Sequence, residues 1–255
     1  MFAILANGLL GVVAGMLVNY LADYLPTDRK FVFPYCQSCG KPYDWPKYLL
    51  WPRRCPHCGH SRGWRTWIVE LCYVLALIYL WEYPTPGLNH ILGVGLLIYF
   101  GLVIIIDLEH RLILHPVSAF GALIGLVAGS WLHGVQATLL GGLFGLAVMF
   151  LLYLGGAWFV RVFSRWRNYA HVDEALGFGD VLLSGVLGLI LGWPGIVLGL
   201  VVTILLAGGV SMILLIKMLI LRRYQPNLTI AYGPFLIASA ILLIFMRPWL
   251  SLAFR

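Results

Sequence analysis

Two aspartates stand out among the ten acidic residues of this 255-residue chain, because each lies at the end of an apolar run. Asp107 directly follows the apolar residues 102–106, and Asp180 begins another run in Gly177-Phe178-Gly179-Asp180. Only twelve residues separate Asp180 from the Trp193-Pro194 turn. They make about 18 Å of helix, whereas the hydrocarbon core of a bilayer is about 30 Å thick. We therefore expect Asp180 below the membrane surface, where an ionisable group is costly and is a functional candidate.

Two carboxylates that face each other across a few ångströms cannot both ionise. One keeps its proton while the other acts as a general base on a shared water, which is the chemistry of an aspartic-protease dyad. We expect Asp107 and Asp180 to form such a pair, with Gly177 and Gly179 allowing another backbone to approach closely. On spacing alone, the alternative is that each aspartate caps a helix or pairs with a nearby arginine.

Four cysteines in the one sizeable polar segment, residues 27–65, have the spacing of a metal site. The first pair is Cys36-Gln37-Ser38-Cys39, and fifteen residues later comes Cys55-Pro56-His57-Cys58, each pair followed by glycine. Four thiolates enclose a tetrahedral Zn²⁺ and leave no open position, so we predict a structural zinc, with His57 and His60 as bystanders. The metal would supply folding energy to a segment too short for a substantial core. Two disulfides are the alternative, disfavoured in a reducing cytoplasm.

The elements that must position these residues are membrane-spanning helices. Hydrophobic residues make up 61% of the chain and charged residues 11%, against about 25% charged in soluble domains. A soluble enzyme, a coiled coil, a disordered tail and a secreted disulfide scaffold are thereby excluded. Long stretches with few or no charges predict an all-α polytopic integral membrane protein with about eight transmembrane helices and a small cytoplasmic zinc-binding loop domain. The predicted spans are roughly residues 2–22, 66–83, 89–106, 112–132, 135–160, 179–193, 195–221 and 232–250.

Basic residues give the predicted orientation. With the N-terminus outside, fifteen of the seventeen lysines and arginines fall on the cytoplasmic side, and only Arg247 and Arg255 fall outside. This asymmetry follows the positive-inside rule and accounts for the formal charge of +7 without a nucleic-acid partner. The zinc segment and both candidate aspartates then lie at the cytoplasmic face. Asp23 and Glu70, at the ends of two predicted spans, are expected to be interfacial.

Together these motifs resemble the type IV prepilin peptidases, membrane aspartic peptidases that are also called leader peptidase/N-methyltransferases. The similarity covers nearly the whole chain. The matching stretches are residues 15–19, Leu25-Pro26, the two cysteine pairs, 107–112, 177–180 and 232–236. The chain departs from the family pattern at Tyr24, where the family often has arginine. It departs again at residues 112–116, where Ile-Pro-Asp is common, and after Asp180, where a lysine is usual.

The resemblance implies that Asp107 and Asp180 are the catalytic pair, with Gly177, Gly179 and Glu109 in supporting roles. The implied substrates are prepilins and pseudopilins, whose leader peptide is removed at the cytoplasmic face of a bacterial inner membrane, for a pilus, a secretion system or a DNA-uptake apparatus. The new N-terminal amine is then methylated with S-adenosylmethionine in bifunctional members, which carry the zinc loop. No sequence motif identifies residues that bind this methyl donor.

The organisation implied by the resemblance has three parts. Residues 1–26 form the first transmembrane helix, 27–65 the cytoplasmic zinc-binding domain with its four cysteine ligands, and 66–255 a membrane peptidase domain with seven transmembrane helices. The expected partners are therefore the pilin-like substrates and the lipid bilayer.

Two other functions fit parts of the sequence. A transporter or ion-translocating protein with a zinc-bearing regulatory loop would also use intramembrane aspartates. It predicts charges on both sides of the bilayer midplane and internal repeats, whereas the intramembrane carboxylates here lie on one side and no clear repeat is found. A non-enzymatic zinc-loop scaffold has no need of Gly-x-Gly-Asp opposite a second aspartate.

Overall fold

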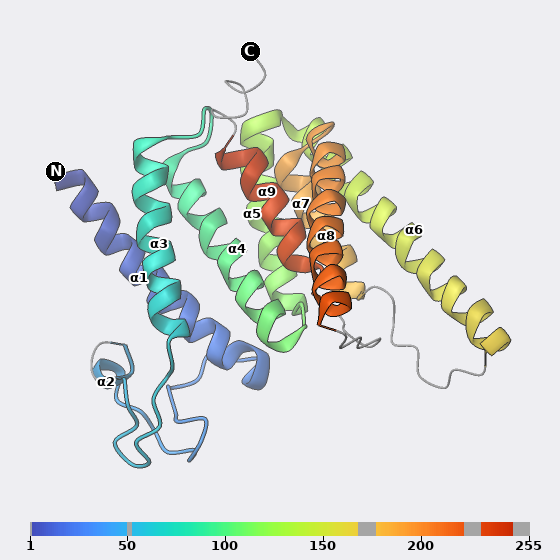
Figure 1. The fold of residues 1–255 in the computed structure, drawn as a ribbon. Helices are drawn as coiled ribbons and strands as arrows, with labels where there is room; N and C mark the ends of the chain where they lie inside the picture. Colours follow the sequence, from blue (N-terminus) through green and yellow to red (C-terminus); the bar gives the residue numbers. More distant parts are fainter. Residues whose placement is uncertain (1, 50–52, 168–176, 222–230, 247–255) are drawn as a thin grey trace. The chain divides into compact units, whose positions relative to one another are not determined.

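The regular structure of this protein is helical, as the composition predicts. The computed structural model describes residues 2–49, 53–167, 177–221 and 231–246, and within these ranges it contains helices and two isolated β-bridges but no strand (Figure 1). The helices are α1 (Phe2–Asp28), α2 (Trp45–Leu49), α3 (Arg65–Glu82), α4 (His90–His110), α5 (His115–His133), α6 (Val135–Arg167), α7 (Phe178–Leu191), α8 (Gly195–Ile220) and α9 (Gly233–Phe245).

Each predicted span falls on one of these helices, and the short α2 in the zinc segment is additional. By length and composition, α1, α4, α5, α6 and α8 are able to cross a membrane, while α7 and α9 are shorter apolar helices. The chain is therefore a multi-pass membrane protein, and eight is an approximate number of spans. The predicted end of the last span, residues 247–250, lies outside the described residues, as do the four basic residues Arg222, Arg223, Arg247 and Arg255.

The chain divides into two compact units. One comprises Met1–Pro84 with Gly93–Ile106, and the other comprises Thr85–Leu92 with Asp107–Arg255. The four cysteines of the two Cys-x-x-Cys motifs belong to the first unit, and both candidate aspartates belong to the second.

In the first unit, α1 packs closely on α3 because two glycines spaced four apart face it. A Cβ added to Gly11 would lie 2.6 Å from the Cα of Val74, and one added to Gly15 would lie 2.7 Å from the Cα of Glu70. Small residues at this spacing allow two helix backbones to approach each other closely. Inside a membrane this matters because the hydrophobic effect does not drive helices together, so their association depends on van der Waals packing. The zinc segment connects the end of α1 to the start of α3, so this contact holds its two ends.

In the second unit, α7 lies at the centre and contacts α5, α6, α8 and α9 (Figure 1). Its contact with α6 is close because Gly188 packs directly on the backbone of Gly141. Ser184 also donates a hydrogen bond of 3.0 Å from its hydroxyl to the backbone oxygen of Gly145. A polar side chain buried among lipid-spanning helices is satisfied in this way, which helps to hold α7 in place.

Candidate active site and metal centre

Asp107 lies in the last turn of α4 and is only 5% exposed. The helix ends just beyond it, where Arg111 adopts a left-handed conformation and donates its backbone N–H to the backbone oxygen of Asp107 at 2.9 Å. Among the described residues, no hydrogen-bond partner satisfies the carboxylate Oδ2 atom. A buried polar atom is costly to leave unpaired, and the backbone of Gly233, at the start of α9, lies against this oxygen.

Asp180 lies in the first turn of α7 and is half-buried. Its backbone N–H donates to the oxygen of Gly177 at 3.1 Å, which fixes the start of the helix. Asp107 and Asp180 both belong to the second unit, at the end of α4 and the start of α7. Two carboxyl groups that reach the same water can share one proton, with one acting as acid and the other as base.

The three predicted supporting residues differ in what surrounds them. Gly179 packs against the loop after α4, because a Cβ at this position would lie 2.7 Å from the Cβ of Ile113. Among the residues that the structure describes, the nearest neighbour of a Cβ at Gly177 would be the Asp180 Oδ2 atom at 3.7 Å. Glu109 is exposed near the end of α4. A close approach to another described residue therefore requires glycine at position 179.

The start of α9 also borders Asp107, and sequence reasoning gave its first residues no role. A Cβ on Gly233 would lie 2.5 Å from the Oδ2 atom of Asp107, so the α9 backbone lies against this carboxylate. Tyr232 comes directly before Gly233 and forms the N-terminal cap of α9. The only signal in the sequence was the family-like stretch 232–236, which marks the segment without revealing its contacts.

The four cysteines of the two Cys-x-x-Cys motifs form one cluster in the first unit. Their sulfur atoms all lie within 4.8 Å of one another, with 3.6 Å between Cys36 and Cys58 and 3.7 Å between Cys39 and Cys55. A tetrahedron with Zn–S bonds of about 2.3 Å has edges of about 3.8 Å, so this arrangement fits zinc. A disulfide needs sulfurs about 2.0 Å apart, and all four cysteines are free thiols.

Each cysteine pair forms a tight turn of the same shape. The N–H of Gly40 donates to the oxygen of Cys36 at 2.8 Å, and the N–H of Gly59 donates to the oxygen of Cys55 at 2.9 Å. Both glycines have positive φ angles, 70° and 71°, a conformation that other residues adopt at a cost. The two turns thereby aim their thiols at a common point, as the spacing predicts.

Asp23, which the sequence predicts to be interfacial, anchors the cysteine segment to α1. Its carboxylate pairs with Arg62 at 2.5 Å and with Arg65, and it accepts a hydrogen bond of 2.6 Å from the hydroxyl of Tyr48. Burial and the neighbouring Asp23 carboxylate raise the pKa of Tyr48, so its phenol remains a neutral donor. The segment is therefore held by a charged cluster in addition to its cysteines.

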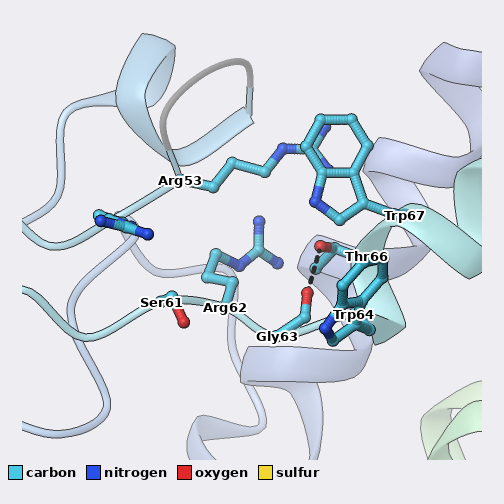
Figure 2. A pocket seen from close by; sticks show the side chains of 8 residues that line it. Arg53, Ser61, Arg62, Gly63, Trp64, Thr66 and Trp67 are labelled. Atoms are coloured by element: carbon cyan, nitrogen blue, oxygen red, sulfur yellow. Dashed lines mark hydrogen bonds between the residues drawn. The ribbon is translucent and has the colours of Figure 1, made fainter.

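Glu70 makes a second ion pair in the same unit. Its carboxylate lies 2.8 Å from the Arg53 guanidinium, and both residues are buried. Arg53 also stacks over the ring of Trp67, with 4.1 Å between the guanidinium carbon and the ring centroid (Figure 2). Removing one partner of a buried pair leaves an uncompensated charge, so these contacts fix the segment relative to α3.

Comparison with known proteins places this architecture among membrane peptidases. Residues 91–213, which include both aspartates, match the model of the type IV leader peptidase family. A prepilin leader peptidase/N-methyltransferase of Pseudomonas aeruginosa is 30% identical over 79% of this chain and 67% of its own length. Proteins of the same name from Stutzerimonas stutzeri and Pectobacterium carotovorum are each 26% identical, over 89% and 92% of this chain and 85% and 90% of their own lengths. No solved structure gives a significant match.

Proposed function

The chain belongs to the type IV leader peptidase family, and we propose that it is a membrane aspartic endopeptidase that removes the leader peptide of type IV prepilins and pseudopilins. Its relatives are named prepilin leader peptidase/N-methyltransferase, which also supports a second activity, methylation of the new N-terminus. The matched region holds α4 to α7 and therefore both members of the aspartate pair.

The peptidase proposal is supported by two findings: Asp107 and Asp180 belong to the same compact unit, and both lie within the region that matches the type IV leader peptidase family. We assign both as catalytic residues. The ionised carboxylate takes a proton from a water, the water oxygen bonds to the scissile carbonyl carbon, and the protonated carboxyl stabilises the developing oxyanion. Collapse of the tetrahedral intermediate breaks the C–N bond, and a proton passes to the leaving amine. Gly179 and Gly233 hold the surrounding backbone close to the pair.

Methylation acts on the amine that this cleavage creates. S-adenosylmethionine, when bound, supplies a methyl group on a positively charged sulfur. The neutral amine would attack that methyl carbon, the electrons of the S–CH₃ bond would return to sulfur, and the product ammonium would release a proton. Such a transfer needs the donor near the membrane face at which the new N-terminus is formed.

The cysteine cluster would hold a structural zinc through Cys36, Cys39, Cys55 and Cys58. Four thiolates fill the tetrahedral coordination of zinc, so the metal would stabilise the segment without taking part in peptide hydrolysis. This assignment keeps residues 27–65 as a zinc-binding domain between the first span, 1–26, and a membrane peptidase domain, 66–255.

The distribution of basic residues supports one orientation of the chain in the membrane. A multi-pass protein of a bacterial inner membrane that follows the positive-inside rule would have its N-terminus outside and its zinc segment and aspartate pair at the cytoplasmic face. Prepilin leaders would then be cut as the substrate helix enters the membrane from the cytoplasm.

The direct test is leader removal by the purified full-length protein in detergent, with a prepilin that retains its leader. We expect cleavage by the wild type and by the control Asp44→Asn, an exposed carboxylate in the zinc segment. Asp180→Asn should abolish it. Absence of cleavage by the wild type in every lipid tested would exclude the peptidase, and substantial cleavage by Asp180→Asn would exclude the dyad.

A further inference from the structure

A cavity of about 470 Å³ lies in the first unit, where the zinc segment joins α3 (Figure 2). Its volume falls in the range of small-molecule sites, about 300–1,000 Å³. The side chains that give the cavity its character are those of Arg53, Arg54, Ser61, Arg62, Trp64 and Trp67. Peptide hydrolysis by the aspartate pair uses none of them.

The three arginines of this cavity do not offer three free charges. Arg53 pairs with Glu70 at 2.8 Å, and Arg62 pairs with Asp23 at 2.5 Å. Arg54 is exposed and makes no ion pair with any residue that the structure describes. The cavity therefore presents one uncommitted guanidinium, which matches a single carboxylate better than a highly charged phosphate ligand.

The two tryptophans provide flat apolar surface beside that guanidinium. The ring of Trp67 is covered on one side by Arg53, as Figure 2 shows. Trp64, in contrast, is 83% exposed. An exposed indole in a cavity is suited to stack on a planar base and to attract a cation to its face.

Two other cavities among the described residues lack this combination. One of about 430 Å³ is lined by α5, α6 and α7, and one of about 250 Å³ is lined by the ends of several helices in the second unit. Neither is lined by an arginine or a lysine. A water-soluble ligand with a carboxylate would therefore find no arginine or lysine to pair with in either cavity.

We propose that the cavity beside the zinc segment binds S-adenosylmethionine. The adenine stacks on Trp64, and the methionine carboxylate pairs with Arg54. The Ser61 hydroxyl forms a hydrogen bond with a polar group between the adenine and the carboxylate. This assignment rests on the methyltransferase part of the proposed function and gives that activity its donor site. It also gives the zinc segment a role, because Arg54 and Ser61 pair in the bridge formed by the second cysteine turn.

The competing ligand is the headgroup of an acidic phospholipid, because arginine and tryptophan are frequent at membrane surfaces. The ion pairs of Arg53 and Arg62 disfavour this alternative, because they leave one guanidinium for the ligand, whereas acidic headgroups are typically bound by a cluster of basic residues. A methyl donor and a headgroup also differ in a measurable way, because only the methyl donor carries a base to stack on Trp64.

Binding is tested by equilibrium dialysis of labelled S-adenosylmethionine against the zinc-loaded, full-length protein in detergent. We expect Trp64→Ala and Arg54→Ala each to weaken binding about tenfold or more, the usual loss for a stacked base or a paired carboxylate. The matched controls are Trp81→Ala, at the other end of α3, and Lys41→Ala, in the same zinc segment, and both should bind as the wild type does. Zinc content is measured for every variant, and Arg54→Lys, which keeps the charge but loses the bidentate geometry, replaces Arg54→Ala if zinc is lost.

Wild-type affinity in both cavity variants would overturn the proposal. So would the absence of S-adenosylmethionine binding by the zinc-loaded wild type, or its complete displacement by glycerol 1-phosphate, which would favour a headgroup site. Leader cleavage by the same wild-type preparation is recorded separately. Failure of the peptidase is thereby distinguished from failure of donor binding.

Discussion

Gly233 lies against the carboxylate of Asp107, so closely that a Cβ at position 233 would be 2.5 Å from the Oδ2 atom. This contact joins the start of α9 to the end of α4 at the aspartate pair. We expect Gly233→Ala to displace the carboxylate and to lower kcat/KM for leader removal about 100-fold, because misplacement by about 1 Å is sufficient for such a loss. Gly208→Ala in α8, where a Cβ meets no atom within 4 Å, is the control. Wild-type cleavage by Gly233→Ala would show that the contact does not position Asp107.

The two aspartates should act as one unit. Asp107→Asn and Asp180→Asn should each reduce leader cleavage by about 1,000-fold or more, and the double variant should be little worse than either single variant. The reason is that one carboxyl is an acid and the other a base in the same step, so the loss of either stops the reaction. The measurement is single-turnover cleavage of a prepilin. Losses that multiply in the double variant would mean that the residues act independently.

The cysteine cluster should carry about one zinc per chain. Metal analysis of Cys36→Ser/Cys39→Ser should find the zinc lost, since two of four ligands are gone. Limited trypsin digestion should then cut within residues 29–65, because a segment of this size depends on its metal for folding energy. Cys72→Ser, which changes the cysteine outside the cluster, should keep its zinc. Full zinc content in the double serine variant would place the metal elsewhere.

The contact between α1 and α3 should be sensitive to a single methyl group. A Cβ on Gly15 would lie 2.7 Å from the Cα of Glu70, so Gly15→Ala should force the helices apart and destabilise the protein by about 1–3 kcal/mol. Thermal unfolding in detergent measures the change. Gly8→Ala, on the same helix, is the matched control because its nearest neighbour would be 4.0 Å away. Equal melting temperatures for the two variants would contradict this packing.

Much of the fold follows from the sequence because its signals are local. Apolar runs long enough to cross a bilayer predict the helices, and a cysteine pair followed by glycine predicts each tight turn, without knowledge of any distant residue. The sequence does not predict which distant partner a side chain meets. Asp23 and Glu70 stand at the ends of predicted spans, and their pairing with Arg62 and Arg53 of the cysteine segment is seen only in the folded chain.

An all-α membrane protein, with four cysteines for a metal centre and two candidate aspartates, is predicted from the sequence alone. The folded chain is needed to see that Gly233 lies against Asp107, and that arginines and tryptophans of the zinc segment and α3 enclose a cavity. The physical reason is that a residue's type and its neighbours along the chain set helix, turn and depth in the membrane. Which distant backbones come into contact depends on helix packing, such as that of α7 among its four neighbours.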